Sequence, residues 1–258
     1  MNYWYQGEFI DSPFLQIPYD DPALIYGASV FTTCRIYGGS LDHPLTMWAA
    51  HRQRLVSSVQ GLGWSDPDWS NILNGVQLLA QTHPVVRITI FSDGRELIWG
   101  KNLPADLGQK QQQGIEAEVV AGFDRTLPHY KTGNYLAPWL ARQQVAQEAI
   151  LVNATGDWLE TSTGNLWGWR DQTWYTPPLA AGILPGIIRT YLVQWLRTQG
   201  KIVDERHWDE ILVNQLTGIA YGNAVVQFIP IHTVLTATGK KNYTIDRSIP
   251  KYLQQAFI

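Results

Sequence analysis

The chain of 258 residues is poor in the residues that hold many metal sites and small folds together. Its one cysteine, Cys34, excludes an internal disulfide and a zinc centre built from several thiolates. Its six histidines never stand at the spacing of zinc ligands. Charged residues make up 16% of the chain and hydrophobic residues 45%, which excludes a disordered chain. We therefore expect a globular protein with a sizeable core and no metal centre.

Long apolar runs and basic runs are also absent. No uncharged apolar stretch approaches about 18 residues, so no transmembrane helix is expected. The segment 1–13 contains Glu8 and Asp11 and has neither the basic nor the apolar part of a signal peptide. The formal net charge is −3, which argues against a nucleic-acid or anionic-membrane partner. By elimination we expect a cytoplasmic protein.

Three common functional motifs are missing as well. The segment 131–133 lacks the glycines of a nucleotide phosphate loop, and no Gly-x-Gly-x-x-Gly follows a predicted strand. No Gly-x-Ser-x-Gly nucleophile turn occurs. Tryptophan is abundant instead, with twelve copies and a cluster between 158 and 174. Packing explains most of these indoles better than an aromatic binding platform.

Hydrophobic spacing and turn residues predict helices mixed with strands in both halves of the chain. The predicted helices are 47–59, a segment between Pro67 and Pro84, 138–147 and a segment after Gly186. The predicted strands are 85–91, 95–99, 115–120, 149–154, a hairpin over 166–175, and late strands at 212–213 and 225–229. The polar stretch 110–113 is expected to be a loop. The aperiodic stretch 122–130 is expected to link two domains, 1–121 and 131–258, of an α/β or α+β enzyme.

Four segments carry residues that suit one chemistry when they are taken together. They are 21–35, 51–55, the pair 130–136 and 156–166, and 176–189. In this order they resemble the class IV pyridoxal-phosphate-dependent enzymes of fold type IV. That family holds branched-chain and D-amino-acid aminotransferases and 4-amino-4-deoxychorismate lyase. The resemblance implies pyridoxal 5'-phosphate as cofactor, a smaller N-terminal α/β domain and a larger cofactor-binding C-terminal domain with a β-barrel-like sheet.

The resemblance assigns roles to individual residues of the cofactor site. Lys131 matches the lysine that holds the cofactor as a Schiff base and then moves a proton at the substrate carbon. Glu160 matches the carboxylate that keeps the cofactor's ring nitrogen protonated. Arg54 matches the arginine that binds the phosphate. Each of these side chains alone is as well explained as a surface charge, and their shared order favours the functional interpretation.

Further phosphate contacts follow from the same resemblance. The backbone N–H groups of Ile187 and Ile188, at a predicted helix N-terminus after Gly186, would bind the phosphate. The family often has threonine where Ile188 stands, so a hydroxyl contact is lost while the backbone contact is kept. Another phosphate contact of the family comes after a late strand, and alignment with 213–216 puts Gln215 there.

The expected substrate pocket shows one departure from the family. By resemblance Tyr26, Phe31 and Thr33 would line it, although strand packing also explains Phe31. Lyases and D-amino-acid aminotransferases commonly have an arginine that grips a substrate carboxylate where this chain has Asp93. Arg95 lies two residues further on and is the candidate substitute.

Three functions are therefore weighed. The first is a lyase that converts 4-amino-4-deoxychorismate to 4-aminobenzoate and pyruvate in folate biosynthesis, because the Phe-Thr-Thr sequence at 31–33 is similar to that of the lyase. The second is an aminotransferase acting on branched-chain or D-amino acids. The third is a relative that binds the cofactor, or nothing, without turnover. The family also implies a homodimer, while a packing role is expected for Cys34.

Overall fold

The computed structural model describes residues 2–245, 252 and 255–257, and the chain forms two compact units. Unit 1 comprises Met1–Pro104 and Tyr130–Asn134, and unit 2 comprises Ala105–His129 and Tyr135–Ile258. The sequence-based boundary at residue 121 differs from this division. Strand β6 (Ile115–Ala121) hydrogen-bonds with strands of unit 2 on both sides and therefore belongs there.

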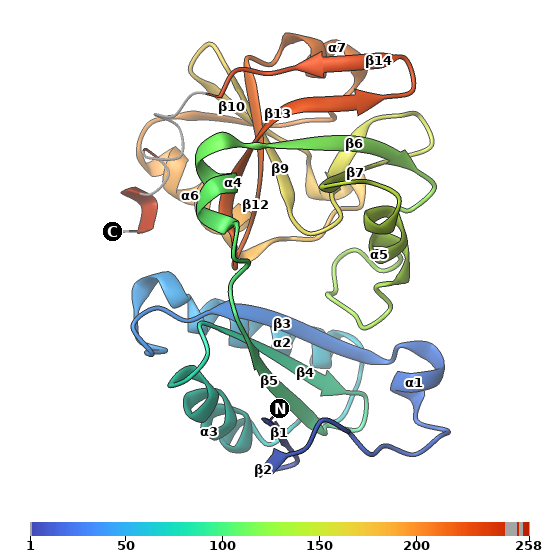
Figure 1. Cartoon of the computed structure of the whole chain (residues 1–258), viewed down its shortest axis with the longest axis vertical. Helices are drawn as coiled ribbons and strands as arrows, with labels where there is room; N and C mark the ends of the chain where they lie inside the picture. Colours follow the sequence, from blue (N-terminus) through green and yellow to red (C-terminus); the bar gives the residue numbers. More distant parts are fainter. Residues whose placement is uncertain (1, 246–251, 253–254, 258) are drawn as a thin grey trace. The chain divides into compact units, whose positions relative to one another are not determined.

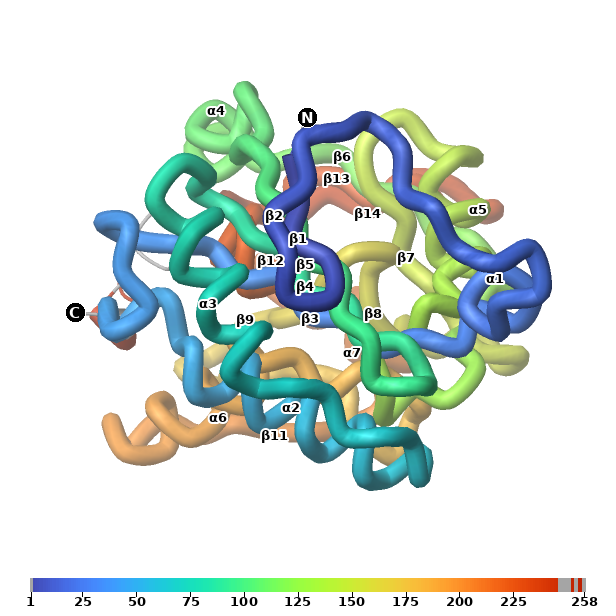
Figure 2. The backbone as a smooth tube through the Cα atoms, turned by 90° about the horizontal axis from the view of Figure 1, so that it is seen from below, coloured from blue at the N-terminus to red at the C-terminus, as the bar shows by residue number. Residues whose placement is uncertain are grey.

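Unit 1 is built on a five-stranded antiparallel sheet in the order β2-β1-β5-β4-β3, which Figure 2 shows side by side. The strands are β1 (Asn2–Tyr5), β2 (Glu8–Asp11), β3 (Ser29–Arg35), β4 (Val85–Phe91) and β5 (Glu96–Lys101). The helices are α1 (Pro22–Tyr26), η1 (Pro44–Thr46), α2 (Trp48–Gly61) and α3 (Trp69–Ala80). The predicted strand 85–91 is confirmed residue for residue.

The two faces of this sheet differ in chemistry. Val86, Ile88 and Ile90 alternate along β4 and are fully buried in one cluster with apolar residues of α2 and α3. Alternation places Arg87 on the opposite face, where its neighbour across the ladder is Thr33. One face thus builds the core, and the other carries polar and charged groups.

Unit 2 contains a sheet that closes on itself, because β8 pairs with β9 as well as with β7. Six strands form this barrel-like ring, namely β6, β7 (Glu148–Val152), β8 (Trp158–Thr161), β9 (Asn165–Arg170), β12 (Gly218–Asn223) and β13 (Gln227–Thr236). The sheet is extended by β10 (Thr173–Thr176), β11 (Ile202–Glu205) and β14 (Gly239–Asn242). The helices are α4 (Leu107–Gln113), α5 (Leu136–Gln143), η2 (Leu179–Ala181), α6 (Ile187–Thr198), α7 (Glu210–Gln215) and η3 (Gln255–Phe257), most of which Figure 1 labels. The expected barrel-like sheet is confirmed.

Tryptophans fill much of the core of unit 2. Trp158, Trp167, Trp169 and Trp174 are all buried, as packing predicts for this cluster. The hairpin between β9 and β10 is also confirmed, and the φ angles of 48° and 65° at positions 171–172 suit a tight hairpin turn.

Two predicted elements were wrong. The stretch 110–113 is the end of helix α4, which is supported by the i,i+4 ion pair of Asp106 with Lys110 (2.9 Å). The expected strand at 212–213 is part of helix α7, because Asp209 caps it by accepting a hydrogen bond from the Leu212 N–H at 2.8 Å. Both segments are short, and local side-chain contacts decide their conformation more than apolar spacing does.

Candidate active site

Lys131 lies on a short segment that extends the sheet of unit 1 at its β3 edge. The Phe31 N–H donates to the Lys131 carbonyl at 2.8 Å, and the Gly133 N–H donates to the Ser29 carbonyl at 2.6 Å. Thr132 forms an isolated bridge with Val30 between them. Backbone pairing therefore fixes the position of the lysine independently of its side chain.

The Lys131 amine lies beside an aromatic ring that it shares with a second cation. Its Nζ is 4.7 Å from the centre of the Phe31 ring, and the Arg87 guanidinium carbon is 3.5 Å from the same centre. Both distances are those of cation–π contacts. Arg87 was not among the predicted site residues. Its alternation with Val86 and Ile88 along β4 indicates that its side chain lies on the face of the sheet away from the core.

Arg54 and His51 belong to helix α2, and the charge of Lys131 acts on His51. His51 is buried, and its Nδ1 is hydrogen-bonded to the Thr32 hydroxyl at 2.6 Å. Burial, followed by the positive charges of Arg54 and Lys131, lowers the pKa of His51 to about 3. The imidazole is therefore neutral, and the two cations are near enough to act on it. In unit 1 Lys131 thus lies beside Phe31, and both Lys131 and Arg54 act on His51. The roles of these residues toward cofactor and substrate stay predictions.

Arg95 is engaged by other groups of unit 1. Its guanidinium forms ion pairs with Asp21 and Asp93 and donates to the Tyr5 hydroxyl at 2.8 Å. Burial lowers the pKa of Arg95, but these three partners outweigh burial and raise it. Two carboxylates already balance this guanidinium, which argues against the expected grip on a substrate carboxylate. The sequence could not show this, since Asp21 lies 74 positions away.

Tyr26 and Thr33 stay predicted residues of the substrate pocket, and they differ in burial. Tyr26 ends helix α1 and is 74% exposed in the chain described here. Thr33 is half-buried on the same face of β3 as Phe31, because residues two apart in a strand share a face.

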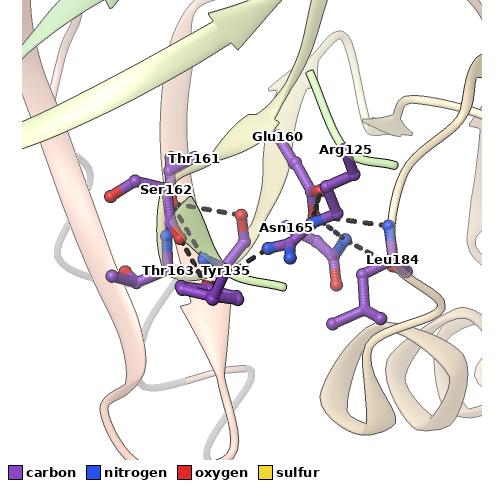
Figure 3. A network of polar contacts seen from close by, with 9 residues as sticks. Arg125, Tyr135, Glu160, Thr161, Ser162, Thr163, Asn165 and Leu184 are labelled. Atoms are coloured by element: carbon purple, nitrogen blue, oxygen red, sulfur yellow. Dashed lines mark hydrogen bonds and ion pairs between the residues drawn. The ribbon is translucent and has the colours of Figure 1, made fainter. Parts of the chain in front are cut away.

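Glu160 is the centre of a buried polar network in unit 2, which Figure 3 shows. It lies in β8, one residue before the strand ends, and forms an ion pair with the Arg125 Nε, with side-chain exposures of 3% for Glu160 and 7% for Arg125. Its Oε2 accepts from the Asn165 amide and from the Leu184 N–H, both at 3.4 Å. Arg125 also donates to the Tyr135 hydroxyl at 3.2 Å. The Glu160 carboxylate is thus held by the Arg125 guanidinium, the Asn165 amide and the Leu184 N–H.

Arg125 and Tyr135 were missed by sequence reasoning. Burial lowers the pKa of the Arg125 guanidinium, and the neighbouring Glu160 carboxylate more than offsets this and raises it. Arg125 belongs to the segment 122–130, which has no hydrophobic periodicity and was interpreted only as a linker. The one signal was an arginine in a loop just before the Lys131 motif.

The N-terminus of helix α6 offers a second group of donors in unit 2. Gly186 is its N-cap, and no side chain caps the helix. The first N–H groups of a helix, here those of Ile187 and Ile188, have no intrahelical acceptor and favour an anion. Asn165 ties this turn to Glu160, since its amide also donates to the Leu184 carbonyl at 2.8 Å.

Gln215 was expected to follow a late strand, where the family has a phosphate contact. It ends helix α7 rather than following a strand, and its side chain accepts from Arg170 at 2.6 Å. The turn that does follow a late strand is 223–226, after β12. There the Asn223 Oδ1 accepts from the N–H groups of Val225 (2.9 Å) and Val226 (3.0 Å). The phosphate contact at Gln215 stays a prediction, and in this structure its side chain is engaged by Arg170.

Two further kinds of feature are absent from the described part of the chain. Among those side chains, no group of three or more His, Cys, Asp or Glu is placed to hold a metal ion. Within the same ranges, no helix has both the length and the apolar character needed to cross a membrane.

The chain matches the family model of class IV amino-transferases over residues 29–234, so it belongs to that family. It is similar to the aminodeoxychorismate lyase of Vibrio harveyi, with 23% identity over 81% of this chain and 87% of the relative. It is also similar to the branched-chain-amino-acid aminotransferase of Escherichia coli K12, with 27% identity over 79% of this chain and 75% of the relative. In structure it is similar to a hypothetical aminotransferase from Mycobacterium tuberculosis in its PLP-bound form, with a TM-score of 0.82, 20% identity, and coverage of 100% of this chain and 97% of the other.

Proposed function

We propose that this chain is a pyridoxal-phosphate-dependent lyase that converts 4-amino-4-deoxychorismate to 4-aminobenzoate and pyruvate. Membership of the class IV family and the likeness to a lyase over most of both chains support the reaction class.

The donor set fits the chemistry of pyridoxal phosphate. Its phosphate needs N–H donors and positive charge, and an uncapped helix α6 and Arg54 supply these. Its ring nitrogen needs a carboxylate that is held in place, and Glu160 is buried and held by Arg125. When bound, pyridoxal phosphate supplies an electron sink for charge that develops on the substrate carbon.

The chain's own residues have distinct tasks in this proposal. The Lys131 amine holds the cofactor covalently and later moves a proton at the amine-bearing carbon of the substrate. Glu160 holds a proton at the ring nitrogen, and Arg125 orients Glu160 through their ion pair. The N–H groups of Ile187 and Ile188 bind and orient the phosphate.

The observation that bears on the substrate class is the pair of cations on the Phe31 ring, which suits a substrate with a carboxylate. Arg87 and Lys131 lie within 3.5 and 4.7 Å of its centre. An arginine beside the reactive lysine suits a substrate that bears carboxylates, because a guanidinium binds carboxylates in a fork. Aminodeoxychorismate carries such groups, and Arg87 takes the role for which Arg95 was first considered.

An aminotransferase is the second candidate function. The 27% identity to a branched-chain-amino-acid aminotransferase favours it, and the same lysine and carboxylate would serve both reactions. The two reactions differ in where the proton is returned, which the donors described above do not distinguish.

A product assay separates the candidates. The protein loaded with cofactor is incubated with aminodeoxychorismate and, separately, with single amino acids. Pyruvate together with 4-aminobenzoate supports the lyase, whereas a keto acid and the pyridoxamine form of the cofactor support the aminotransferase. Lys131→Ala and Lys131→Arg should both abolish turnover, because an arginine keeps the charge without a reactive amine. Lys240→Ala, at an exposed position, is the control. Unchanged pyruvate release by Lys131→Ala would refute the role of the lysine.

We also propose that the protein is a homodimer, as the family resemblance implies, and that it acts in the cytoplasm in folate biosynthesis. Light scattering of the purified full chain at working concentration tests the dimer.

A further inference from the structure

A second buried carboxylate lies in the barrel, outside the residues assigned above. Glu148 begins β7 and is 3% exposed. It accepts hydrogen bonds from the Ser162 hydroxyl and, at 2.8 Å, from the Thr163 hydroxyl. Burial raises the pKa of this carboxyl, and the two hydroxyl groups oppose the rise. Because a buried carboxylate is costly to keep, its presence calls for a role other than packing.

The two hydroxyl groups belong to the turn 161–164 between β8 and β9. The Thr161 N–H donates to the Gly164 carbonyl at 2.7 Å, and the Gly164 N–H donates to the Thr161 hydroxyl at 3.0 Å. The Ser162 N–H donates to the Ala149 carbonyl at 2.9 Å, which fastens the turn to β7. Glu148 and its neighbour thus anchor the turn by both backbone and side chain.

The same turn leads directly to the carboxylate site. The Ser162 carbonyl accepts from the Tyr135 hydroxyl at 2.6 Å, and that hydroxyl accepts from Arg125 at 3.2 Å. Arg125 in turn forms the ion pair with Glu160. Figure 3 shows the part of this path from Ser162 to Glu160. The hydrogen bonds therefore run without a break from Glu148 to Glu160.

We propose that Glu148 is a positioning residue for the carboxylate site. It holds the turn 161–164 so that the Ser162 carbonyl keeps the Tyr135 hydroxyl, and through it Arg125, in place against Glu160. The inference rests on the proposed function, in which Glu160 serves the cofactor's ring nitrogen.

A double-mutant cycle between Glu148 and Tyr135 tests the path. Pyridoxal phosphate is titrated into the full chain, and quenching of tryptophan fluorescence gives the affinity. Glu148→Gln removes one of two acceptor oxygens and should weaken binding by about fivefold, the value of one net hydrogen bond. In a Tyr135→Phe background the same substitution should have less than about twofold effect, because the path is already broken. An equal loss in both backgrounds would overturn the proposal.

Two controls separate positioning from a general effect on stability. Ser162→Ala cuts the path at its second member and should reproduce the loss seen for Glu148→Gln. Glu96→Gln changes an equally buried carboxylate of unit 1, which accepts from the Gly7 N–H at 2.8 Å. It should leave the cofactor affinity unchanged. A matching loss for Glu96→Gln would show that any buried carboxylate matters, and would contradict the proposal.

Amide hydrogen exchange provides a readout without cofactor. In the unloaded chain, Glu148→Gln should speed exchange in peptides covering 158–166 and 132–137, with helix α3 unchanged. Equal rates everywhere, or uniform acceleration, would overturn the inference. If the wild-type chain takes up no pyridoxal phosphate, the proposed function fails, and the exchange experiment still decides whether Glu148 holds the turn.

Discussion

Replacing Arg125 by methionine should destabilise unit 2 more than any change at its surface. The substitution keeps much of the apolar length of the side chain and removes its charge. Glu160 then keeps a buried negative charge, and the Asn165 amide and the Leu184 N–H beside it are neutral donors. The loss therefore arises from the carboxylate that remains and not from a cavity.

The magnitude follows from the burial of the pair. Side-chain exposures of 7% for Arg125 and 3% for Glu160 place it among buried ion pairs, for which solvent screening is small. Removing one partner of such a pair costs about 3–5 kcal/mol, because an uncompensated charge stays in the interior. For a domain of this size that corresponds to a fall in Tm of roughly 10 °C.

Thermal unfolding followed by tryptophan fluorescence near pH 8 measures this loss, since Trp158 and Trp167 lie in the same unit. Adding Glu160→Gln to Arg125→Met should recover part of the stability at high pH. A Tm within about 1 °C of wild type near pH 8, or an additive loss in the double variant, would refute the reasoning.

Three further predictions concern unit 1. Gly133→Ala should lower both stability and cofactor uptake, because a Cβ there would overlap the Ser29 hydroxyl, and the cost should be about 1–3 kcal/mol by urea unfolding. His51 remains neutral in the folded state down to a pKa of about 3, whereas the unfolded chain takes up a proton near 6.5, so stability should fall as pH decreases through this window. A Tm series should show a flatter slope for His51→Gln, and an unchanged slope would contradict the burial argument. Arg87→Met should raise KM for the carboxylate-bearing substrate by about tenfold with a smaller change in kcat, since the proposed charged hydrogen bond from Arg87 to the substrate carboxylate is lost. An unaltered KM would exclude Arg87 from binding.

The fold was largely predictable where one physical signal dominated. Strand β4 was found residue for residue because Val86, Ile88 and Ile90 alternate with polar residues. Segments 110–113 and 212–213 were misassigned because both are short and polar contacts override their apolar spacing. For the segment 212–213, the capping side chain of Asp209 is the feature of the sequence that indicates a helix.

The candidate site was predictable where a motif carried it. Lys131, Arg54 and Glu160 were proposed from ordered segments. Arg125 was not, because its meaning comes from Glu160, 35 positions along the chain. Arg95 is the opposite case. Its position near Asp93 suggested that it binds the substrate carboxylate, whereas it forms an ion pair with Asp21, which is remote in sequence. Partners that are remote in sequence decide what a charged side chain does.

The assignment of Tyr130–Asn134 to unit 1 has a consequence for the order of folding. The chain passes from one unit to the other after Pro104, after His129 and after Asn134, so neither unit is a single stretch of sequence. During synthesis the β3 edge stays without this partner until Gly133 has left the ribosome, and an unpaired edge invites association with other chains. A fragment ending at Pro104 would expose that edge permanently. The lysine segment therefore also protects the sheet that positions it.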